Sequence, residues 1–380
     1  MRFVAVTAGI LVVIISSVSG SVFPPLELAD RSPSARAHGL AESGVSIADF
    51  GFQSINPATI GLVGLEQRGV LTFTPVYSRP LQDWDVRDKG YSQLHGGAMG
   101  SMVLSRNETS PQSVVSVAYS VSRMKMPIYS YAWWYSGYTR SVVHDLSVAY
   151  GRRGAVDYAV GGSVNFLNFD DYLGLGDNRV GGGSGVCFDI GAIARFNKLR
   201  LTDGLRLTPS AGISLKSFGP HIDYRLYHPS GDVESLGLDR QLKAGVSMAL
   251  VQQHSDIIVP TLLVSADYEH HFNDYNMTTR VFHYDDNYYR LGAEFGLAEI
   301  MMVRVGSLVQ NNSEPLSSWG ISAVPSVWFR SLLDRNRSNT GNPSWLRQVD
   351  VAVEYSKSGD SPSFYYDNER YLDITLLWRW

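Results

Sequence analysis

Apolar and polar residues alternate along several segments of this chain, and each segment is about as long as a strand that crosses a bilayer. Successive side chains of a strand point to opposite sides, so this pattern places apolar residues against lipid and polar or small residues in a lumen. Val115, Val117 and Tyr119, for example, interleave with serine and alanine. The pattern is equally regular in 205–217, 240–251 and 346–357. Since a membrane strand needs about 9–11 residues, these segments predict a transmembrane barrel.

About fourteen segments of this kind can be counted, an even number as in single-chain bacterial barrels. They lie at 67–78, 94–105, 112–122, 141–151, 155–167, 185–197, 205–217, 240–251, 258–270, 288–297, 300–310, 318–331, 346–357 and 369–380. Connections after odd-numbered segments are mostly long and those after even-numbered segments mostly short, as outer loops and periplasmic turns are. The exception is 332–345, a long connection where a short one is due. We predict an all-β fold, a transmembrane antiparallel β-barrel of about 14 strands with both chain ends in the periplasm.

Composition separates this barrel from two alternatives. A helical membrane protein would contain several apolar runs of about 20 residues. Here hydrophobic residues make up 44% of the chain at a mean hydropathy of -0.08, and only the N-terminus approaches such a run. A soluble β-sandwich also alternates, but the face opposite the apolar one is too polar and too small to form a sandwich core. The 21 Tyr and 8 Trp suit the aromatic girdles of a membrane barrel.

The first 20 residues have the parts of a secretory signal peptide. Arg2 supplies the positive charge, residues 4–15 are apolar, and residues 18–20 are small enough for the cleavage positions. A retained membrane anchor is the alternative, but serines interrupt the apolar run before it reaches a full span. We therefore expect cleavage after about Gly20.

The last segment carries the most specific local signal. One of its faces is apolar, with Leu377 as an exception on the other face, and consists of Leu372, Ile374, Leu376, Trp378 and Trp380. An apolar face that ends on an aromatic residue resembles the signal read by the barrel-assembly machinery. We assign Tyr371, Trp378 and Trp380 to this assembly signal. The predicted location is the cell outer membrane of a Gram-negative bacterium, with outer-membrane lipid and the assembly machinery as partners.

Residues 21–66 do not alternate and are rich in small side chains. Asn56 and Pro57 favour a turn, because the residue before a proline is held out of the helical region. A short helix from Ala58 to Leu65 follows, with Asn56 as its cap. A segment of this length ahead of a closed barrel can fold into the lumen. The chain is therefore divided into a signal peptide (1–20), an N-terminal lumenal hatch or plug (21–66) and an outer-membrane β-barrel (67–380).

Two stretches of the sequence resemble one family of outer-membrane barrels. The pattern A-R-A-x-G-L-A-x-x-G-V-S-I-A-D, which begins at Ala35, is followed by I-N-P-A at 55–58. This order is similar to the N-terminus of the FadL-like barrels, above all their PorV/PorQ branch. Residues 290–295 and 303–306 resemble a strand pair of the same branch. The run Ala58-Thr59-Ile60-Gly61 departs from the family, where an A-G-L/A-A-L run is more usual.

This resemblance implies a fourteen-stranded barrel with an N-terminal hatch. Some members of the family move hydrophobic small molecules such as fatty acids or aromatics across the outer membrane, and this is the function we expect. The PorV type instead serves type IX secretion and handles cargo proteins at the cell surface. A component that binds a translocon or cargo is therefore the alternative. The corresponding partners are a hydrophobic small molecule or secretion-system proteins.

Three charged residues of the predicted strands at 288–297 and 300–310 are candidate lumenal groups. Arg290, Glu294 and Arg304 alternate with apolar residues and so face the lumen. Charges in a lumen need partners or water. One interpretation is a structural ion pair between Glu294 and Arg304 that holds the hatch to the wall, and the other is a role in substrate binding. The first is favoured.

The connection 123–140 contains an unusual group of apolar side chains. Its members include Met124, Met126, Tyr131, Trp133 and Trp134. An apolar patch exposed to water marks binding or a membrane interface, and methionine packs adaptably. The patch is therefore a candidate hydrophobic outer loop that docks a ligand or partner chain. The other interpretation is an aromatic girdle at headgroup level, and it is favoured because Trp133 and Trp134 lie close to the predicted strand at 141–151.

The sequence offers little support for an enzyme. Glu269, His270 and His271 could suggest metal binding or acid–base chemistry, but they fall near a predicted long loop where solvated polar residues are expected. Familiar catalytic motifs are absent from the sequence, and the single cysteine, Cys187, lies among apolar residues. The net charge of -4 with scattered Lys and Arg gives no basic stripe for nucleic acid. We expect no catalytic residue, no metal and no cofactor.

Overall fold

The computed structural model describes residues 34–78, 91–107, 110–129, 135–173, 178–196, 199–202, 205–220, 222–226, 233–236, 240–252, 260–272, 287–297, 300–310, 315–325, 349–358 and 370–379. The predicted signal peptide lies outside these residues, as do Tyr131, Trp133, Trp134 and Trp380. No helix among the described residues is both long and apolar enough to span a membrane.

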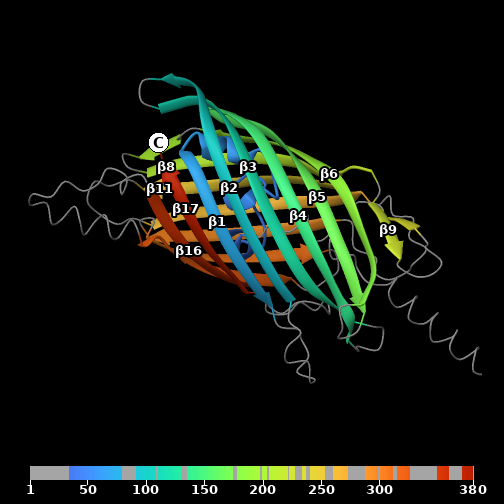
Figure 1. Ribbon diagram of the computed structural model, residues 1–380. Coiled ribbons are helices and arrows are strands. Elements are labelled where there is room, and N and C mark those ends of the chain that lie inside the picture. The colour runs from blue at the N-terminus through green and yellow to red at the C-terminus, as the bar shows by residue number, and fades with distance from the viewer. Residues whose placement is uncertain are drawn as a thin grey trace, which may run out of the picture.

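Antiparallel strands pair into one closed sheet that forms a barrel (Figure 1). Its wall consists of fourteen strands: β1 (Gln67–Ser78), β2 (Tyr91–Asn107), β3 (Ser110–Tyr129), β4 (Tyr135–Arg152), β5 (Val156–Leu173), β6 (Asn178–Phe196), β8 (Leu205–Phe218), β11 (Arg240–Gln252), β12 (Pro260–Phe272), β13 (Asn287–Leu297), β14 (Met301–Gln310), β15 (Leu316–Ala323), β16 (Val349–Ser358) and β17 (Arg370–Arg379). Three short strands extend the wall: β7 (Leu199–Thr202), β9 (Ile222–Leu226) and β10 (Val233–Leu236). The wall closes where β1 pairs with β17, with Val70 opposite Leu377. The predicted antiparallel barrel of about 14 strands is confirmed.

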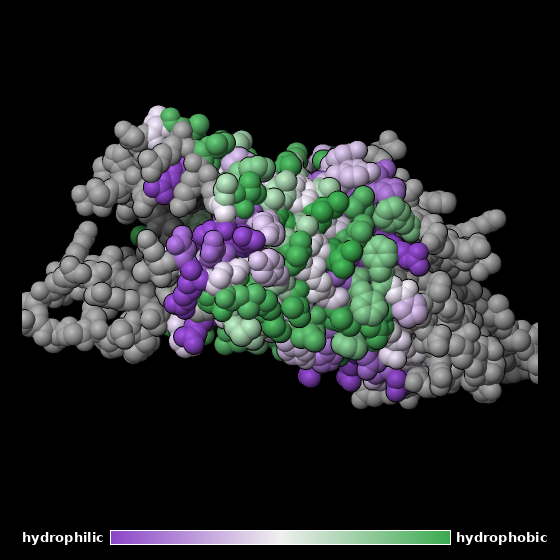
Figure 2. All heavy atoms as spheres, turned by 90° about the horizontal axis from the view of Figure 1, so that it is seen from above, coloured by the Kyte–Doolittle hydropathy of each residue, from purple (hydrophilic) through white to green (hydrophobic). Residues whose placement is uncertain are grey.

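The wall has an apolar outer face and a mostly polar inner face. β-Branched and aromatic residues, which favour strands, point outward at alternate positions. Ile190, Val246 and Val305, for example, are 57%, 59% and 55% exposed, whereas the inward Ser116 and Ser147 are fully buried. Figure 2 shows hydrophobic residues over the middle of the visible wall and hydrophilic residues gathered towards its ends. Such an apolar band suits the hydrocarbon layer of a bilayer.

The two ends of the barrel differ in their connections. Residues 108–109 join β2 to β3 and residues 153–155 join β4 to β5, whereas residues 273–286 join β12 to β13 at the opposite end. β1 begins and β17 ends where the connections are short, which is the periplasmic end in bacterial barrels. The long connection between β15 and β16 at this end lies largely outside the described residues.

The wall is also taller on one side. Strands β2 to β6 have 17–20 residues, whereas β13 to β17 have 8–11. At a tilt near 40°, a strand of about 20 residues rises about 50 Å, roughly twice the height of the apolar band of a membrane barrel. The wall formed by β2 to β6 therefore extends beyond the apolar layer of the membrane.

Several predicted boundaries were wrong. The segments predicted at 155–167 and 185–197 are longer, since β5 continues to Leu173 and β6 begins at Asn178. The strand predicted at 318–331 is shorter, since β15 ends at Ala323. The N–H of Val324 then donates a hydrogen bond to the carbonyl of Ile300. The predicted loop 123–140 is mostly strand, because β3 and β4 continue to pair after the apolar alternation ends, with Lys125 opposite Arg140. A ladder needs only backbone donors and acceptors, so it can continue where lipid no longer imposes the alternation.

Residues 34–66, called the hatch segment below, lie inside the barrel, where they are blue in Figure 1. The segment contains three short helical elements: α3 (Ala35–Gly39), the 3-10 turn η1 (Phe50–Phe52) and α4 (Thr59–Gly64). The side chains of Ser34 and Asp49 accept hydrogen bonds from the N–H groups of Arg36 and Gly51, and so cap α3 and η1.

Asn56 has a different role from the predicted helix cap. Its side-chain oxygen accepts a hydrogen bond from the N–H of Ala58 at 3.0 Å, which closes the turn over the buried Pro57. α4 begins only after Ala58, and no side chain caps it. The Asn56 amide donates to the carbonyls of Val45 and Ala192 at 2.8 and 3.1 Å. Asn56 therefore ties the turn to both the hatch segment and β6.

Candidate functional site

The hatch segment packs against the inner wall through clusters of buried apolar residues. One cluster joins Phe50, Ile60 and Val63 to inward residues of β1, β2, β3 and β4. Leu377, the apolar exception on the inward face of the last strand, packs against this cluster. Another cluster joins α4 to β3, β5 and β6 and consists of Ala58, Leu62, Leu65, Val114, Ala159 and Ile193. The hatch segment thus supplies the apolar core that the polar inner wall lacks.

Glycines of the inner wall give the hatch backbone room to approach. A Cβ at Gly151 would overlap the backbone of Gly61, and a Cβ at Gly212 would overlap the backbone of Val45. Gly100 of β2, which is exposed, would have nothing within 4 Å of its Cβ. The inner glycines are therefore required for space, and any side chain there would push the hatch segment away from the wall.

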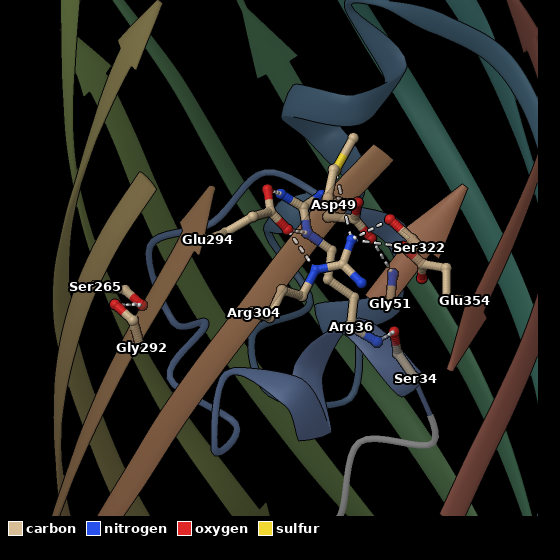
Figure 3. Close-up of polar contacts among 11 residues, drawn as sticks. Ser34, Arg36, Asp49, Gly51, Ser265, Gly292, Glu294, Arg304, Ser322 and Glu354 are labelled. Atoms are coloured by element: carbon tan, nitrogen blue, oxygen red, sulfur yellow. Dashed lines mark hydrogen bonds and ion pairs between the residues drawn. The ribbon is translucent and has the colours of Figure 1, made fainter. Parts of the chain in front are cut away.

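A buried group of charges fastens α3 to the wall (Figure 3). Arg36 donates hydrogen bonds to Glu294 of β13 at 2.8 and 3.1 Å and to Asp49 at 2.6 Å. Arg304 of β14 has a fully buried side chain and donates to the same Glu294 at 2.5 Å and to Glu354 of β16 at 2.8 Å. We call these five residues the Arg36 cluster. It brings together two of the predicted lumenal charges and three residues that were not singled out from the sequence.

The Arg36 cluster holds charge inside the barrel in a defined arrangement. Burial opposes the charge on Arg36, but the carboxylates of Glu294 and Asp49 outweigh it and raise the pKa of the guanidinium above its ordinary value. Buried ion pairs add little net stability, but removing one partner is costly because the other charge is left unpaired. The cluster therefore fixes the position of the hatch segment more than it raises the free energy of unfolding of the barrel.

Arg290, the third predicted lumenal charge, fastens the hatch segment at a second place. It donates hydrogen bonds to Glu42 of the hatch segment and to Glu269 of β12, both at 3.0 Å. Glu269 also contacts Lys243 at 3.2 Å and His271 at 2.7 Å. The expectation that Glu269 and His271 lie in a solvated loop was wrong, because β12 continues to Phe272 and turns both side chains inward. Among the described residues, no group of His, Cys, Asp and Glu is arranged to hold a metal ion.

A small cavity of about 20 Å³ lies between part of the hatch segment and β1, β2, β3 and β17. Its polar lining includes Ser34, Gln53, Ser54, Thr72, Thr74, His95, Ser120 and Asp373. This volume accommodates about one water molecule, whereas ligand pockets have about 300 Å³ or more. The hatch segment therefore leaves no room for an organic ligand at this place.

The inner face of the wall carries an apolar patch. It lies between the hatch segment and the barrel end opposite the periplasmic turns. It consists of Val143, Leu167, Phe169 and Cys187, each 1–6% exposed. Val143 pairs with Leu167 across β4 and β5, and both point inward with their alternating neighbours. The patch begins one inward position beyond Asp145, whose carboxylate accepts a hydrogen bond from Gln53 of the hatch segment at 2.5 Å. The inner wall thus carries four buried apolar side chains just outside the hatch segment.

The candidate hydrophobic outer loop is not a loop in its first part. Met124 and Met126 belong to β3 and pair with Ser141 and Thr139 of β4. The other three residues of that group, Tyr131, Trp133 and Trp134, lie outside the described residues. The proposed docking role of this group therefore stays a prediction.

Two residues of the predicted assembly signal lie on opposite faces of β17. Trp378 points outward and is 48% exposed, and the guanidinium carbon of Arg68 lies 5.3 Å from its ring centroid. Tyr371 faces the lumen, is 1% exposed and stacks on His38 of α3 with 3.5 Å between ring centroids. Positions 371 and 378 differ by an odd number, so the two side chains cannot share one face. Tyr371 contacts the hatch segment and not lipid.

A closed antiparallel barrel with an apolar outer band and a polar lumen defines this chain as an outer-membrane β-barrel. No protein-family model and no curated protein matches the chain. Among solved structures it is similar to a deletion mutant of the monoaromatic hydrocarbon channel TodX of Pseudomonas putida, with a TM-score of 0.52 and 10% identity over 91% of this chain and 99% of that chain. This likeness supports the barrel fold.

Two further solved structures are similar over comparable lengths. One is a FadL homologue of Pseudomonas aeruginosa, with a TM-score of 0.49 and 11% identity over 91% of this chain and 98% of that chain. The other is the translocator domain of the autotransporter NalP from Neisseria meningitidis, with a TM-score of 0.47 and 12% identity over 91% of this chain and 100% of that chain. Membership of the PorV/PorQ branch stays a prediction.

Proposed function

We propose that this barrel passes hydrophobic small molecules, such as fatty acids or aromatics, across the outer membrane. The observation that carries the proposal is the buried apolar patch on the inner wall, directly outward of the hatch segment. Leu167 and Phe169 would hold an apolar molecule away from water. The barrel most similar in shape to this one among those described above belongs to a monoaromatic hydrocarbon channel. Small aromatics are therefore the first compounds to test.

Passage in this proposal requires the hatch segment to shift. The segment packs against the inner wall, and the cavity beside it accommodates about one water molecule. Besides the apolar clusters, its contacts with the wall include ion pairs and hydrogen bonds, as at Arg36, Arg290 and Asn56. Water can replace such contacts as the segment moves. The hatch segment would therefore exclude polar solutes at rest and yield when an apolar molecule occupies the patch.

The patch can be tested by making it polar. The double variant Leu167→Asn/Phe169→Gln is expected to lower the uptake of toluene or a fluorescent fatty acid into vesicles about thirtyfold or more, because two buried apolar side chains each contribute on the order of 1–2 kcal/mol of contact and about 1.4 kcal/mol is a factor of ten. The matched control is Phe166→Gln, which changes the outward neighbour on the same strand, 48% exposed. Unchanged uptake by the double variant, in protein that folds and inserts normally, would count against the proposal.

A second candidate function is that of a PorV-like secretion component that binds a translocon or cargo proteins. The observation in its favour is the tall wall of β2 to β6, which extends beyond the apolar layer of the membrane and offers a surface to other proteins. The discriminating experiment is a pull-down from solubilised outer membranes. Stoichiometric recovery of a large translocon barrel or a cargo protein, together with unchanged uptake of aromatics after deletion of the gene, would favour this function over transport.

A further inference from the structure

Three basic side chains gather on the outward face of β3 and β4, at the barrel end opposite the periplasmic turns. Arg123 and Lys125 follow Val117, Tyr119 and Val121 on the same outward face of β3. Arg140 faces outward on the adjacent β4 and pairs with Lys125 across the two strands. All three side chains are exposed. We call them the outer basic cluster, and they begin where the apolar band of this wall ends.

Aromatic rings hold two of these cations in place. The Lys125 ammonium lies 4.1 Å from the ring centroid of Tyr138, and the Arg140 guanidinium carbon lies 5.3 Å from the same ring. Arg140 also lies 5.1 Å from the ring of Tyr172, which stacks on Tyr138 with 4.7 Å between centroids. Like charges directly opposite each other destabilise a strand pair, and cation–π contacts offset part of that cost. The cations are thus positioned before any anion arrives.

Basic residues outnumber acidic ones among the described outward residues of this surface. Asp170 lies opposite Arg140 on β5, but its carboxylate forms an ion pair with Arg179 of β6. Asp171 points inward, where it accepts a hydrogen bond from Thr139. Among the described outward residues of this part of β3 to β6 there are thus four basic groups and one carboxylate. The described outward residues here carry a net charge of about +3, and such a surface attracts anions.

We propose that the outer basic cluster binds the phosphate-bearing headgroup of a lipid in the outer leaflet. The cluster faces away from the lumen and continues the lipid-facing surface, so its level is that of the headgroups. Leu94, opposite Arg123 on β2, is 43% exposed, and Tyr119 is 48% exposed, which provides an apolar surface for acyl chains directly below. Guanidinium groups suit phosphate because their planar donors match its oxygens. This site is separate from the lumen, and it anchors the tall side of the barrel at a defined depth.

Native mass spectrometry of the full-length barrel in detergent tests this proposal, with lipid A as a bisphosphorylated glycolipid and its dephosphorylated form as the comparison. We expect the wild type to retain the phosphorylated lipid and the variant Arg123→Gln/Lys125→Gln/Arg140→Gln to retain about tenfold less. The matched control Arg68→Gln/Arg106→Gln/Arg152→Gln removes the same charge from exposed positions at the periplasmic end and should bind as the wild type does. Compact migration on gels before heating confirms that each variant is folded.

A second variant separates charge from side-chain shape. Lys125→Arg/Arg140→Lys keeps the charge of the cluster and should retain the phosphorylated lipid. The proposal is overturned if the triple glutamine variant binds as the wild type does, or if the wild type binds both forms of the lipid alike. Displacement of the lipid by equimolar inorganic phosphate would also overturn it, because the ligand would then be a free anion.

Discussion

Replacing Arg304 by Met is expected to lower the free energy of unfolding by about 3–5 kcal/mol. The side chain is fully buried and bonds both Glu294 and Glu354. Without it, Arg36 is the one remaining cation of the Arg36 cluster against three carboxylates. The unpaired charges should be relieved by movement of α3, which exposes Arg36 to trypsin. Equilibrium unfolding by urea in lipid vesicles measures the loss, and mass spectrometry of tryptic fragments detects cleavage at Arg36.

Two comparisons make the Arg304 result specific. The double variant Arg304→Met/Glu354→Gln removes one of the unpaired carboxylates and should recover part of the lost stability. Arg179→Met breaks an exposed ion pair and should cost about 0–1 kcal/mol. If Arg304→Met is no less stable than Arg179→Met, the Arg36 cluster does not hold the hatch segment as described.

Placing a side chain at Gly212 should have the second large effect. The Cβ of Gly212→Val would overlap the backbone of Val45 and Ser46, and backbone cannot rotate aside as a side-chain tip can. Overpacking of this kind costs about 1–3 kcal/mol. The hatch segment should leave the wall, which raises the tryptic cleavage at Arg36 and the leakage of small polar dyes through reconstituted barrels.

Gly100→Val is the matched control for Gly212→Val, because the same residue enters a wall strand where nothing lies within 4 Å of the new Cβ. It should show the leakage and unfolding of the wild type. Equal leakage from both variants would show that valine disturbs the wall itself, and the account of the inner glycines would then be wrong.

The wall could be predicted from the sequence because lipid and lumen impose opposite chemistries on the two faces of each strand. That constraint located all fourteen wall strands. It fails where the strand leaves the membrane, since both faces then accept polar residues. Lys125 and Arg140 are paired in the ladder, yet they fall in a segment predicted as a loop.

The site could be predicted only in part. Inward charges on adjacent strands need partners, so Glu294 and Arg304 could be placed together from the alternation alone. Arg36 and Asp49 could not be added, because the hatch segment has no periodicity that says which residue meets which strand. The contact of Gly212 with the hatch backbone could not be predicted for the same reason, because it depends on the course of the hatch segment along the wall.

The central claim is that the hatch segment must move for a hydrophobic molecule to pass. A disulfide can test it directly, because the hydroxyl oxygens of Ser43 in the hatch segment and Ser265 on β12 lie 2.7 Å apart, so cysteines at these positions are within the reach of such a bond. In a Cys187→Ala background, Ser43→Cys/Ser265→Cys should take up toluene when reduced. When oxidised it should lose most of that uptake, and the reductant should restore it. Full uptake with the bond formed would contradict the claim.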